Sequence, residues 1–273
     1  MGAGCVNIRE LSLRPRFVHA RLPPIPEITP KISMRFLVFQ HIAIEHPGIF
    51  RDFFAADGIQ WDAVELDEGE AIPSLDGYDA LWVMGGPMDV WEESEHPWLK
   101  AEKAAIREWV QDRAKPYMGL CLGHQLLGSA LGGKVGKMEK AEVGILDINL
   151  TEAGRTDPLF AGIETPFQAL QWHGAAVLEA PAEAVILADS PVCANQAMRI
   201  GDLAYGLQYH TELTTKTVGE WGEVPAYACA LDETLGQGAL ARLDAEATNK
   251  MSDFARDSRR LYDNFMTLLK ARS

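Results

Sequence analysis

The chain has 273 residues, of which 47% are apolar and 23% charged, the balance of an ordinary globular protein that can bury a core without disulfides or metals. A formal net charge of −14 repels phosphate backbones, so we expect no nucleic-acid partner. No apolar run reaches the roughly 18 residues that cross a bilayer, and the N-terminus lacks the apolar core of a secretory signal, so we expect a cytoplasmic protein without a membrane anchor.

Residues 1–33 differ in composition from the rest of the chain. Four prolines between residues 23 and 30 disfavour helix and central strand, and basic residues outnumber acidic ones. We therefore expect a poorly ordered N-terminal extension over residues 1–33, followed by one domain over residues 34–273.

Short apolar runs alternate with helical patterns in the first half of the domain. The runs predict strands, and the helical patterns predict the helices between them: strands at 35–39, 61–66, 80–84 and 116–119, and helices at 47–57, 96–112 and 123–131. Strands that alternate with helices in this way are typical of βαβ units and a mostly parallel sheet.

The second half of the domain predicts a different connection of strands. Strands are expected at 143–150, 167–171, 185–188, 197–200 and 204–209, several of them without a helix between. From residue 214 the chain reads as helical, with one long amphipathic helix at 239–269 that packs on the sheet or, alternatively, forms a homo-oligomer contact. We expect an α/β three-layer sandwich whose mostly parallel, flavodoxin-like central sheet carries an antiparallel extension and has helices on both faces.

The sequence Gly-Leu-Cys-Leu-Gly-His-Gln at residues 119–125 lies between a predicted strand and a predicted helix. This is the G-x-C-x-G form of a nucleophile elbow, in which glycines on both sides leave room for a sharp turn. The following helix points its positive N-terminus at Cys121, which favours a reactive thiolate. A buried cysteine in a tight turn is the alternative.

The sequence Tyr-His-Thr-Glu at residues 209–212 follows the last predicted strand. Side chains two residues apart on a strand face the same side, so Glu212 could orient the imidazole of His210. A cysteine nucleophile needs such a base with its orienting carboxylate, although an H-x-E pattern alone is common.

The sequence Gly-Gly-Pro at residues 85–87 ends another predicted strand. Ligand sites in open α/β sheets lie at the carboxyl ends of strands, where glycines let backbone N–H groups approach a substrate. The N–H groups of Gly86 and Leu122 could together form an oxyanion hole. Taken alone, the motif is also compatible with a plain turn.

These three motifs, in this order, resemble the class I glutamine amidotransferase family, and are most similar to stand-alone members related to the glutaminase domain of GMP synthase. The resemblance extends over nearly the whole chain from Met34 and includes Gln-Trp-His-Gly at residues 171–174. It implies that Cys121 attacks the side-chain amide of glutamine, that His210 carries the proton and that Glu212 orients His210.

The resemblance also implies contacts to the substrate and one departure from the family pattern. Gly85, Gln125 and the backbone around Trp172 and His173 are expected to hold glutamine. For the ring of His173 the favoured interpretation is packing by Trp172 without a proton role, because His210 already serves as the base. Where the family often has an aspartate, this chain has Ala175. The contact made by that aspartate is therefore in doubt.

The resemblance implies a glutaminase that passes ammonia to a separate synthetase, because the chain has no phosphate-binding loop to activate an acceptor itself. A γ-glutamyl peptide or amide hydrolase with the same triad and a catalytically weak binding or regulatory module are the alternatives. We expect no cofactor, and no metal because no histidine or cysteine shows ligand spacing. Glu45 and His46 follow the first strand and could lie near the site, although a solvated loop is the favoured interpretation.

Overall fold

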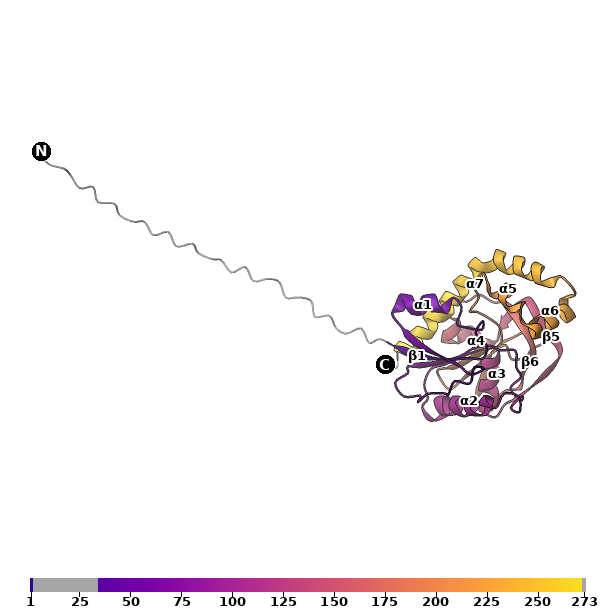
Figure 1. Cartoon of the computed structure of the whole chain (residues 1–273), viewed down its shortest axis with the longest axis horizontal. Coiled ribbons are helices and arrows are strands. Elements are labelled where there is room, and N and C mark those ends of the chain that lie inside the picture. Colours follow the sequence, from indigo (N-terminus) through magenta and orange to yellow (C-terminus); the bar gives the residue numbers. More distant parts are fainter. Residues whose placement is uncertain (2–33, 272–273) are drawn as a thin grey trace. The chain divides into compact units, whose positions relative to one another are not determined.

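A computed structural model describes residue 1 and residues 34–271 (Figure 1). The N-terminal extension expected over residues 1–33 lies outside the described residues, apart from Met1 at its start, so its order stays a prediction. Among the described residues, no helix has both the length and the apolar character required to cross a membrane.

One nine-stranded sheet forms the centre of the domain, with the order β2-β1-β3-β4-β9-β8-β7-β5-β6. The first five strands in this order are parallel to one another, and the remaining strand pairs are antiparallel. The strands are β1 (Arg35–Gln40), β2 (Gln60–Glu65), β3 (Ala80–Val83), β4 (Tyr117–Leu120), β5 (Lys134–Leu150), β6 (Phe167–Glu179), β7 (Ala184–Asp189), β8 (Ala197–Ile200) and β9 (Ala204–Leu207). The predicted mostly parallel sheet with an antiparallel extension is therefore confirmed.

Helices cover both faces of the parallel half of the sheet (Figure 1). Phe36 and Val38 of β1 pack in one cluster with the helices α1 (Phe50–Asp57) and α7 (Ala239–Lys270). The alternate residues of the same strand pack in a second cluster with the helices α2 (Trp98–Arg107) and α3 (Leu122–Ala130). Because successive strand residues face opposite sides, both faces are buried, which explains the apolar runs in the sequence.

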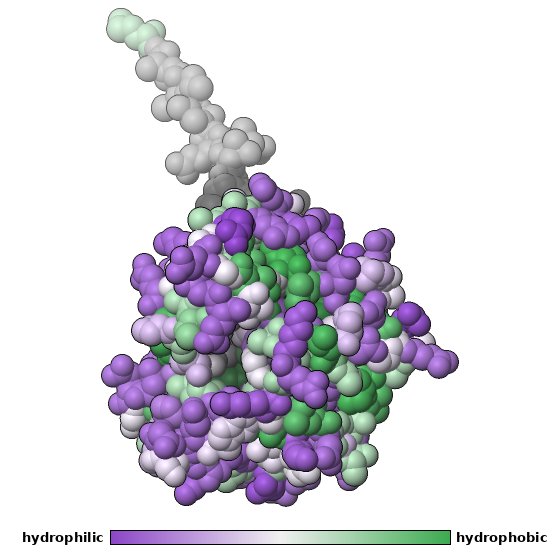
Figure 2. Space-filling model, turned by 90° about the vertical axis from the view of Figure 1, so that its right-hand side faces the viewer, coloured by the Kyte–Doolittle hydropathy of each residue, from purple (hydrophilic) through white to green (hydrophobic). Residues whose placement is uncertain are grey.

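Two further helices, α5 (Thr217–Trp221) and α6 (Pro225–Leu235), belong to a third apolar cluster. This cluster joins them to β5, β6 and the first half of α7, through residues such as Trp172 and Leu243. The apolar side chains of α5 and α6 therefore cover the antiparallel end of the sheet. On the face of the molecule shown in Figure 2, hydrophilic residues predominate and hydrophobic ones lie between them.

The structure corrects the extent of several elements. β5 begins at Lys134 and β6 continues to Glu179, so the two strands form an antiparallel ribbon much longer than predicted. The first part of β5 is polar and mostly exposed, and therefore lacks the apolar run that indicates a buried strand. The predicted helix at 96–112 is α2 followed by a π-helical turn over Glu108–Asp112. Two short elements were not predicted: α4 (Glu152–Thr156) and a 3-10 turn over Pro158–Phe160.

Candidate active site

The predicted elbow has the backbone that its sequence requires. β4 ends at Leu120, α3 begins at Leu122, and Cys121 between them has φ 49° and ψ −102°. A positive φ is costly for a residue other than glycine, and such strain is concentrated at functional sites. A Cβ at Gly123 would lie 2.1 Å from the carbonyl oxygen of Val83, so only glycine lets the helix approach β3 this closely.

His210 and Glu212 form a hydrogen-bonded pair just beyond β9. The His210 Nδ1 lies 2.7 Å from Glu212 Oε1, and the other carboxylate oxygen of Glu212 accepts from the backbone N–H of Thr211 at 2.8 Å. Both residues are 2% exposed. β9 ends at Leu207 and His210 forms an isolated antiparallel bridge with Leu170, so the expected pairing of the two side chains occurs just beyond the strand.

Cys121 and His210 follow two strands that are paired with each other. β4 and β9 are paired, with Leu120 opposite Leu207, which brings the residues that follow them to one edge of the sheet. Burial lowers the pKa of His210, but the charge of Glu212 and the charge and hydrogen bond of Cys121 outweigh burial and raise that pKa well above its ordinary value. The surroundings of the imidazole therefore favour its protonated form.

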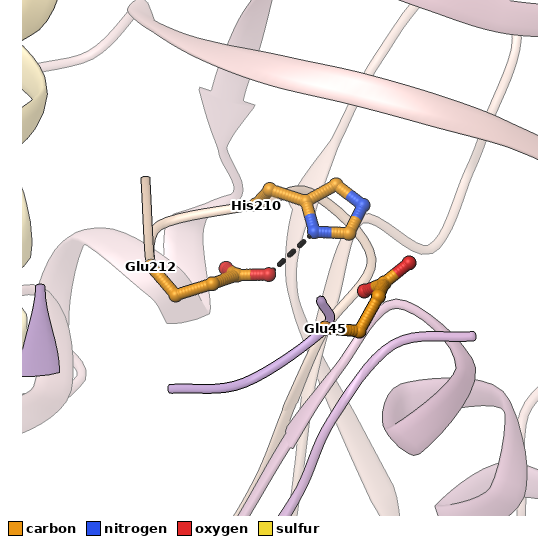
Figure 3. A group of neighbouring side chains, drawn as sticks. All are labelled: Glu45, His210 and Glu212. Atoms are coloured by element: carbon orange, nitrogen blue, oxygen red, sulfur yellow. Dashed lines mark hydrogen bonds and ion pairs between the residues drawn. The ribbon is translucent and has the colours of Figure 1, made fainter. Parts of the chain in front are cut away.

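Glu45 lies beside the site, which the sequence allowed only as the less favoured alternative. We expected a solvated loop, but the Glu45 side chain is buried, and its Oε1 accepts a hydrogen bond from the hydroxyl of Tyr227 on α6. Figure 3 shows Glu45 beside His210 and Glu212, and one ligand atom of each lies within 4.8 Å of the others. Burial is the main cause that raises the pKa of Glu45, with a contribution from the charge of Glu212.

The cluster of Glu45, His210 and Glu212 also bears on metal binding. These residues could offer three ligand atoms to a cation, but Glu212 Oε1 already pairs with the ring of His210. The geometry is therefore that of an acid–base cluster as well as of a potential metal site. The absence of a metal stays a prediction from the sequence.

A pocket of about 250 Å³ opens above Cys121. It is enclosed by four parts of the chain: residues 86–89 after β3, residues 121, 122 and 125 of the elbow, residues 141 and 172–175 of the β5–β6 ribbon, and residues 226, 227, 230, 233 and 234 of α6. Among the described residues, the backbone N–H groups of Gly86 and Leu122 donate to no carbonyl oxygen in the hydrogen bonds of turns, loops and helix caps. Both are therefore available to a substrate oxygen.

The residues predicted to hold substrate have different surroundings. Gln125 lines the pocket, but its amide nitrogen donates to the carbonyl oxygen of Ala175 and to Oε1 of Gln208. His173 also lines the pocket, with Nδ1 2.9 Å from the Ala175 oxygen and Nε2 3.2 Å from Glu142 Oε2. The Ala175 carbonyl is thus the point at which these two side chains are fixed.

Trp172 and Gly85 complete this group of predicted contacts. Trp172 lines the pocket and donates its indole N–H to the carbonyl oxygen of Tyr227, which ties β6 to α6. Gly85 is not among the lining residues, and its carbonyl oxygen lies 2.8 Å from His41 Nδ1. Their roles toward a substrate stay predictions.

Two more residues near Cys121 could not be found from the motifs. The amide nitrogen of Gln208 donates to the sulfur of Cys121 at 3.7 Å. Tyr227 lines the pocket from α6, 182 residues after its partner Glu45. Gln208 could have been suspected from its place two residues before His210, whereas Tyr227 had no signal because only tertiary packing brings it there.

We predict that Glu45→Gln stabilises the protein at neutral pH. The raised pKa of Glu45 means that its ionisation opposes folding, so wild-type stability falls as pH rises from the ordinary value of 4.5 through the folded value. The glutamine variant lacks this ionisation. Urea unfolding at several pH values should show that the wild type has a lower free energy of unfolding than the Glu45→Gln variant. This difference should grow with pH and then level off.

A matched variant sharpens this test. Tyr227→Phe removes the hydroxyl that lowers the pKa of Glu45 through its hydrogen bond. In this variant the fall of the free energy of unfolding with rising pH should therefore continue to higher pH than in the wild type. A stability difference between wild type and Glu45→Gln that does not change with pH would contradict the assignment.

Comparison with known proteins identifies the family. The family model of glutamine amidotransferase class-I matches residues 53–221, which is more than half of the chain. The chain belongs to the class-I glutamine amidotransferase family. Among solved structures, a glutamine amidotransferase from Thermotoga maritima is similar with a TM-score of 0.76 and 27% identity, over 85% of this chain and 98% of that chain. The fold of this class-I glutamine amidotransferase therefore agrees with its sequence.

Several relatives of this class-I glutamine amidotransferase are named for different activities. The glutamine amidotransferase-like protein YfeJ of Salmonella typhimurium is 34% identical over 68% of this chain and 78% of its own length. Gamma-glutamyl peptidase 3 of Arabidopsis thaliana is 28% identical over 63% of this chain and 71% of its own. A glutamine-hydrolyzing GMP synthase component of Sulfolobus acidocaldarius is 29% identical over 56% of this chain and 77% of its own. The relatives thus include both a peptidase and one component of a synthase.

Proposed function

We propose that this protein is a cysteine-dependent glutaminase that releases ammonia from the side-chain amide of glutamine. The placement of Cys121 and His210 just after the paired strands β4 and β9, with His210 hydrogen-bonded to Glu212, is the observation that carries the proposal. A nucleophile, a base and an orienting carboxylate gathered at one site are what covalent amide hydrolysis needs.

The proposed reaction has two steps. In the first, the Cys121 sulfur bonds to the amide carbon, the thiol proton passes through His210 to the nitrogen, and the C–N bond breaks to release ammonia. In the second, water attacks the γ-glutamyl thioester, its proton passes through His210 to the sulfur, and glutamate leaves. The N–H groups of Gly86 and Leu122 stabilise the oxyanion in both steps, a kind of contact worth about 3 kcal/mol for each donor.

The proposed acceptor of the ammonia is a separate synthetase. The similarity to the GMP synthase component of Sulfolobus acidocaldarius supports this, since that relative is named as one part of a larger enzyme. The sequence offers no phosphate-binding loop with which this chain could activate an acceptor. Glutamine is then the substrate, and the synthetase is a partner in trans.

A γ-glutamyl peptide or amide hydrolase is the second candidate. The pocket extends from Cys121 to Glu233 and Thr234 on α6, which provides lining beyond the reacting amide, and the relative named gamma-glutamyl peptidase 3 supports a substrate with a second residue. The thioester chemistry is the same for both candidates. A regulatory module with little turnover is the third candidate and requires an unreactive Cys121.

A substrate panel separates these candidates. Purified protein is assayed against glutamine, γ-glutamyl dipeptides and γ-glutamyl amides, and kcat/KM is compared. We predict that glutamine exceeds the dipeptides by about tenfold or more, equivalent to ~1.4 kcal/mol of transition-state stabilisation. The reverse order would replace the glutaminase assignment by the peptidase, and no labelling of Cys121 by a glutamine-like electrophile would support the regulatory module.

A further inference from the structure

A buried histidine–glutamate pair lies behind the loop that carries Gly86, and the proposed reaction does not use it. His41 follows β1, and its Nδ1 lies 2.8 Å from the carbonyl oxygen of Gly85. Its Nε2 lies 2.9 Å from Oε1 of Glu102 on α2. Both side chains are 0% exposed, and a buried charged pair away from the reacting atoms needs an explanation.

The proton positions on this pair follow from its partners. A carbonyl oxygen only accepts hydrogen bonds, so Nδ1 of His41 must carry a proton toward Gly85. This holds whether Glu102 is a carboxylate, which makes the ring an imidazolium, or a neutral acid, which leaves the ring neutral. Burial lowers the pKa of His41, but the charge and hydrogen bond of Glu102 outweigh it and raise that pKa.

The bond from His41 fixes the direction of a second group. The carbonyl of Gly85 and the N–H of Gly86 belong to one planar peptide and point to opposite sides of it. Because the carbonyl is held toward His41, the N–H points away from the ring, and Gly86 lines the pocket together with Cys121. Two consecutive glycines would otherwise let this peptide rotate easily.

Side chains at the two glycines could not replace this restraint. A Cβ at Gly85 would lie 2.0 Å from Oε2 of Glu45, and a Cβ at Gly86 would lie 2.8 Å from Cβ of His41. A side chain at Gly86 would therefore clash with His41 and one at Gly85 would displace the carboxylate of Glu45, and the orientation of the loop comes from a neighbour. His41 is held in turn by Glu102 and by stacking on Trp98, with ring centroids 5.5 Å apart.

We propose that His41 and Glu102 are positioning residues of the oxyanion hole: His41 orients the Gly85–Gly86 peptide toward the substrate oxygen, and Glu102 orients His41. The inference rests on the proposed function only in that Cys121 is acylated by a substrate bound in the pocket. Donation to the Gly85 carbonyl also polarises the peptide and strengthens the N–H of Gly86 as a donor.

The test compares two reactions of Cys121. Acylation by glutamine or by p-nitrophenyl acetate passes through an oxyanion, whereas iodoacetamide alkylates the sulfur by displacing iodide and forms none. The first variant, His41→Leu with Glu102→Leu, replaces the buried pair by apolar side chains, a change that is often neutral or stabilising for the fold. We expect acylation to fall by about 10²-fold, as for loss of an oxyanion donor, with alkylation changed less than about twofold.

The second variant, His41→Asn with Glu102→Gln, restores a donor. The amide nitrogen of asparagine occupies nearly the place of Nδ1, so acylation should recover to within roughly tenfold of the wild type. Equal acylation in both variants, or equal loss of acylation and alkylation in the first, would overturn the proposal. The p-nitrophenyl acetate arm does not depend on glutamine recognition, so failure of the glutaminase assignment and failure of this inference give different results.

Discussion

Replacing Cys121 by alanine is expected to abolish ammonia release from glutamine and from every γ-glutamyl compound that the wild type hydrolyses. The sulfur forms the bond that the rest of the site stabilises, so the loss should reach roughly 10⁴-fold or more, as for other nucleophiles in a cooperating triad. The measurement is glutamate formation under conditions of excess substrate.

Cys229 provides a matched control for this substitution. It is a free cysteine on α6 that is exposed and does not line the pocket, so Cys229→Ser should retain nearly full activity. Activity in the Cys121→Ala variant above about one hundredth of the wild-type value would exclude the proposed mechanism.

Replacing His210 by asparagine is expected to lower kcat by about 10³-fold while the protein stays folded. Proton transfer by a positioned base contributes 10²–10⁴-fold, and asparagine cannot accept the thiol proton. Alkylation of Cys121 by iodoacetamide should slow in the same variant, because the proposal makes His210 the base that takes the thiol proton. Both rates can be measured on one preparation.

A control for this variant is His96→Asn, since His96 lies before α2 and does not line the pocket. Glu212→Gln should give an intermediate loss, because glutamine can still hydrogen-bond the ring but carries no charge to stabilise the imidazolium. A His210→Asn variant with nearly normal kcat would show that another group serves as the base.

The positions of the proposed nucleophile and base could be predicted because each belongs to a local pattern. The glycines around Cys121 indicate a sharp turn between a strand and a helix. The apolar run before His210 indicates the end of a buried strand. The rule that parallel strands end at one edge then predicts that the two motifs lie at the same edge, and the pairing of β4 with β9 makes them neighbours there.

The surroundings of the site could not be predicted, because they depend on packing between distant segments. Glu45 is buried by Tyr227, and nothing local to either residue indicates the other. His41 is not part of any motif, yet its ring bonds to Glu102 of α2 and to the carbonyl oxygen of Gly85. A polar residue in a loop is usually solvated, so a single sequence favours the wrong surroundings for Glu45.

The ribbon of β5 and β6 shows the same limit for an entire element. The first part of β5 lacks the apolar run by which the other strands were found, although the ribbon carries Trp172 and His173 to the pocket. His173 and Ser190 both contact the buried carboxylate of Glu142. Specific polar contacts thus add to apolar packing on this side of the site.

The most direct test of the account is to trap the covalent intermediate. Protein mixed with glutamine, or with the best γ-glutamyl substrate, is quenched in acid within the first turnover and digested for peptide mass analysis. We predict a γ-glutamyl adduct on the peptide that contains Cys121, absent from the Cys121→Ala protein and accumulating when hydrolysis of the thioester is slow. Turnover of substrate with no adduct on Cys121 at any quench time, or with an adduct on another residue, would contradict the central claim.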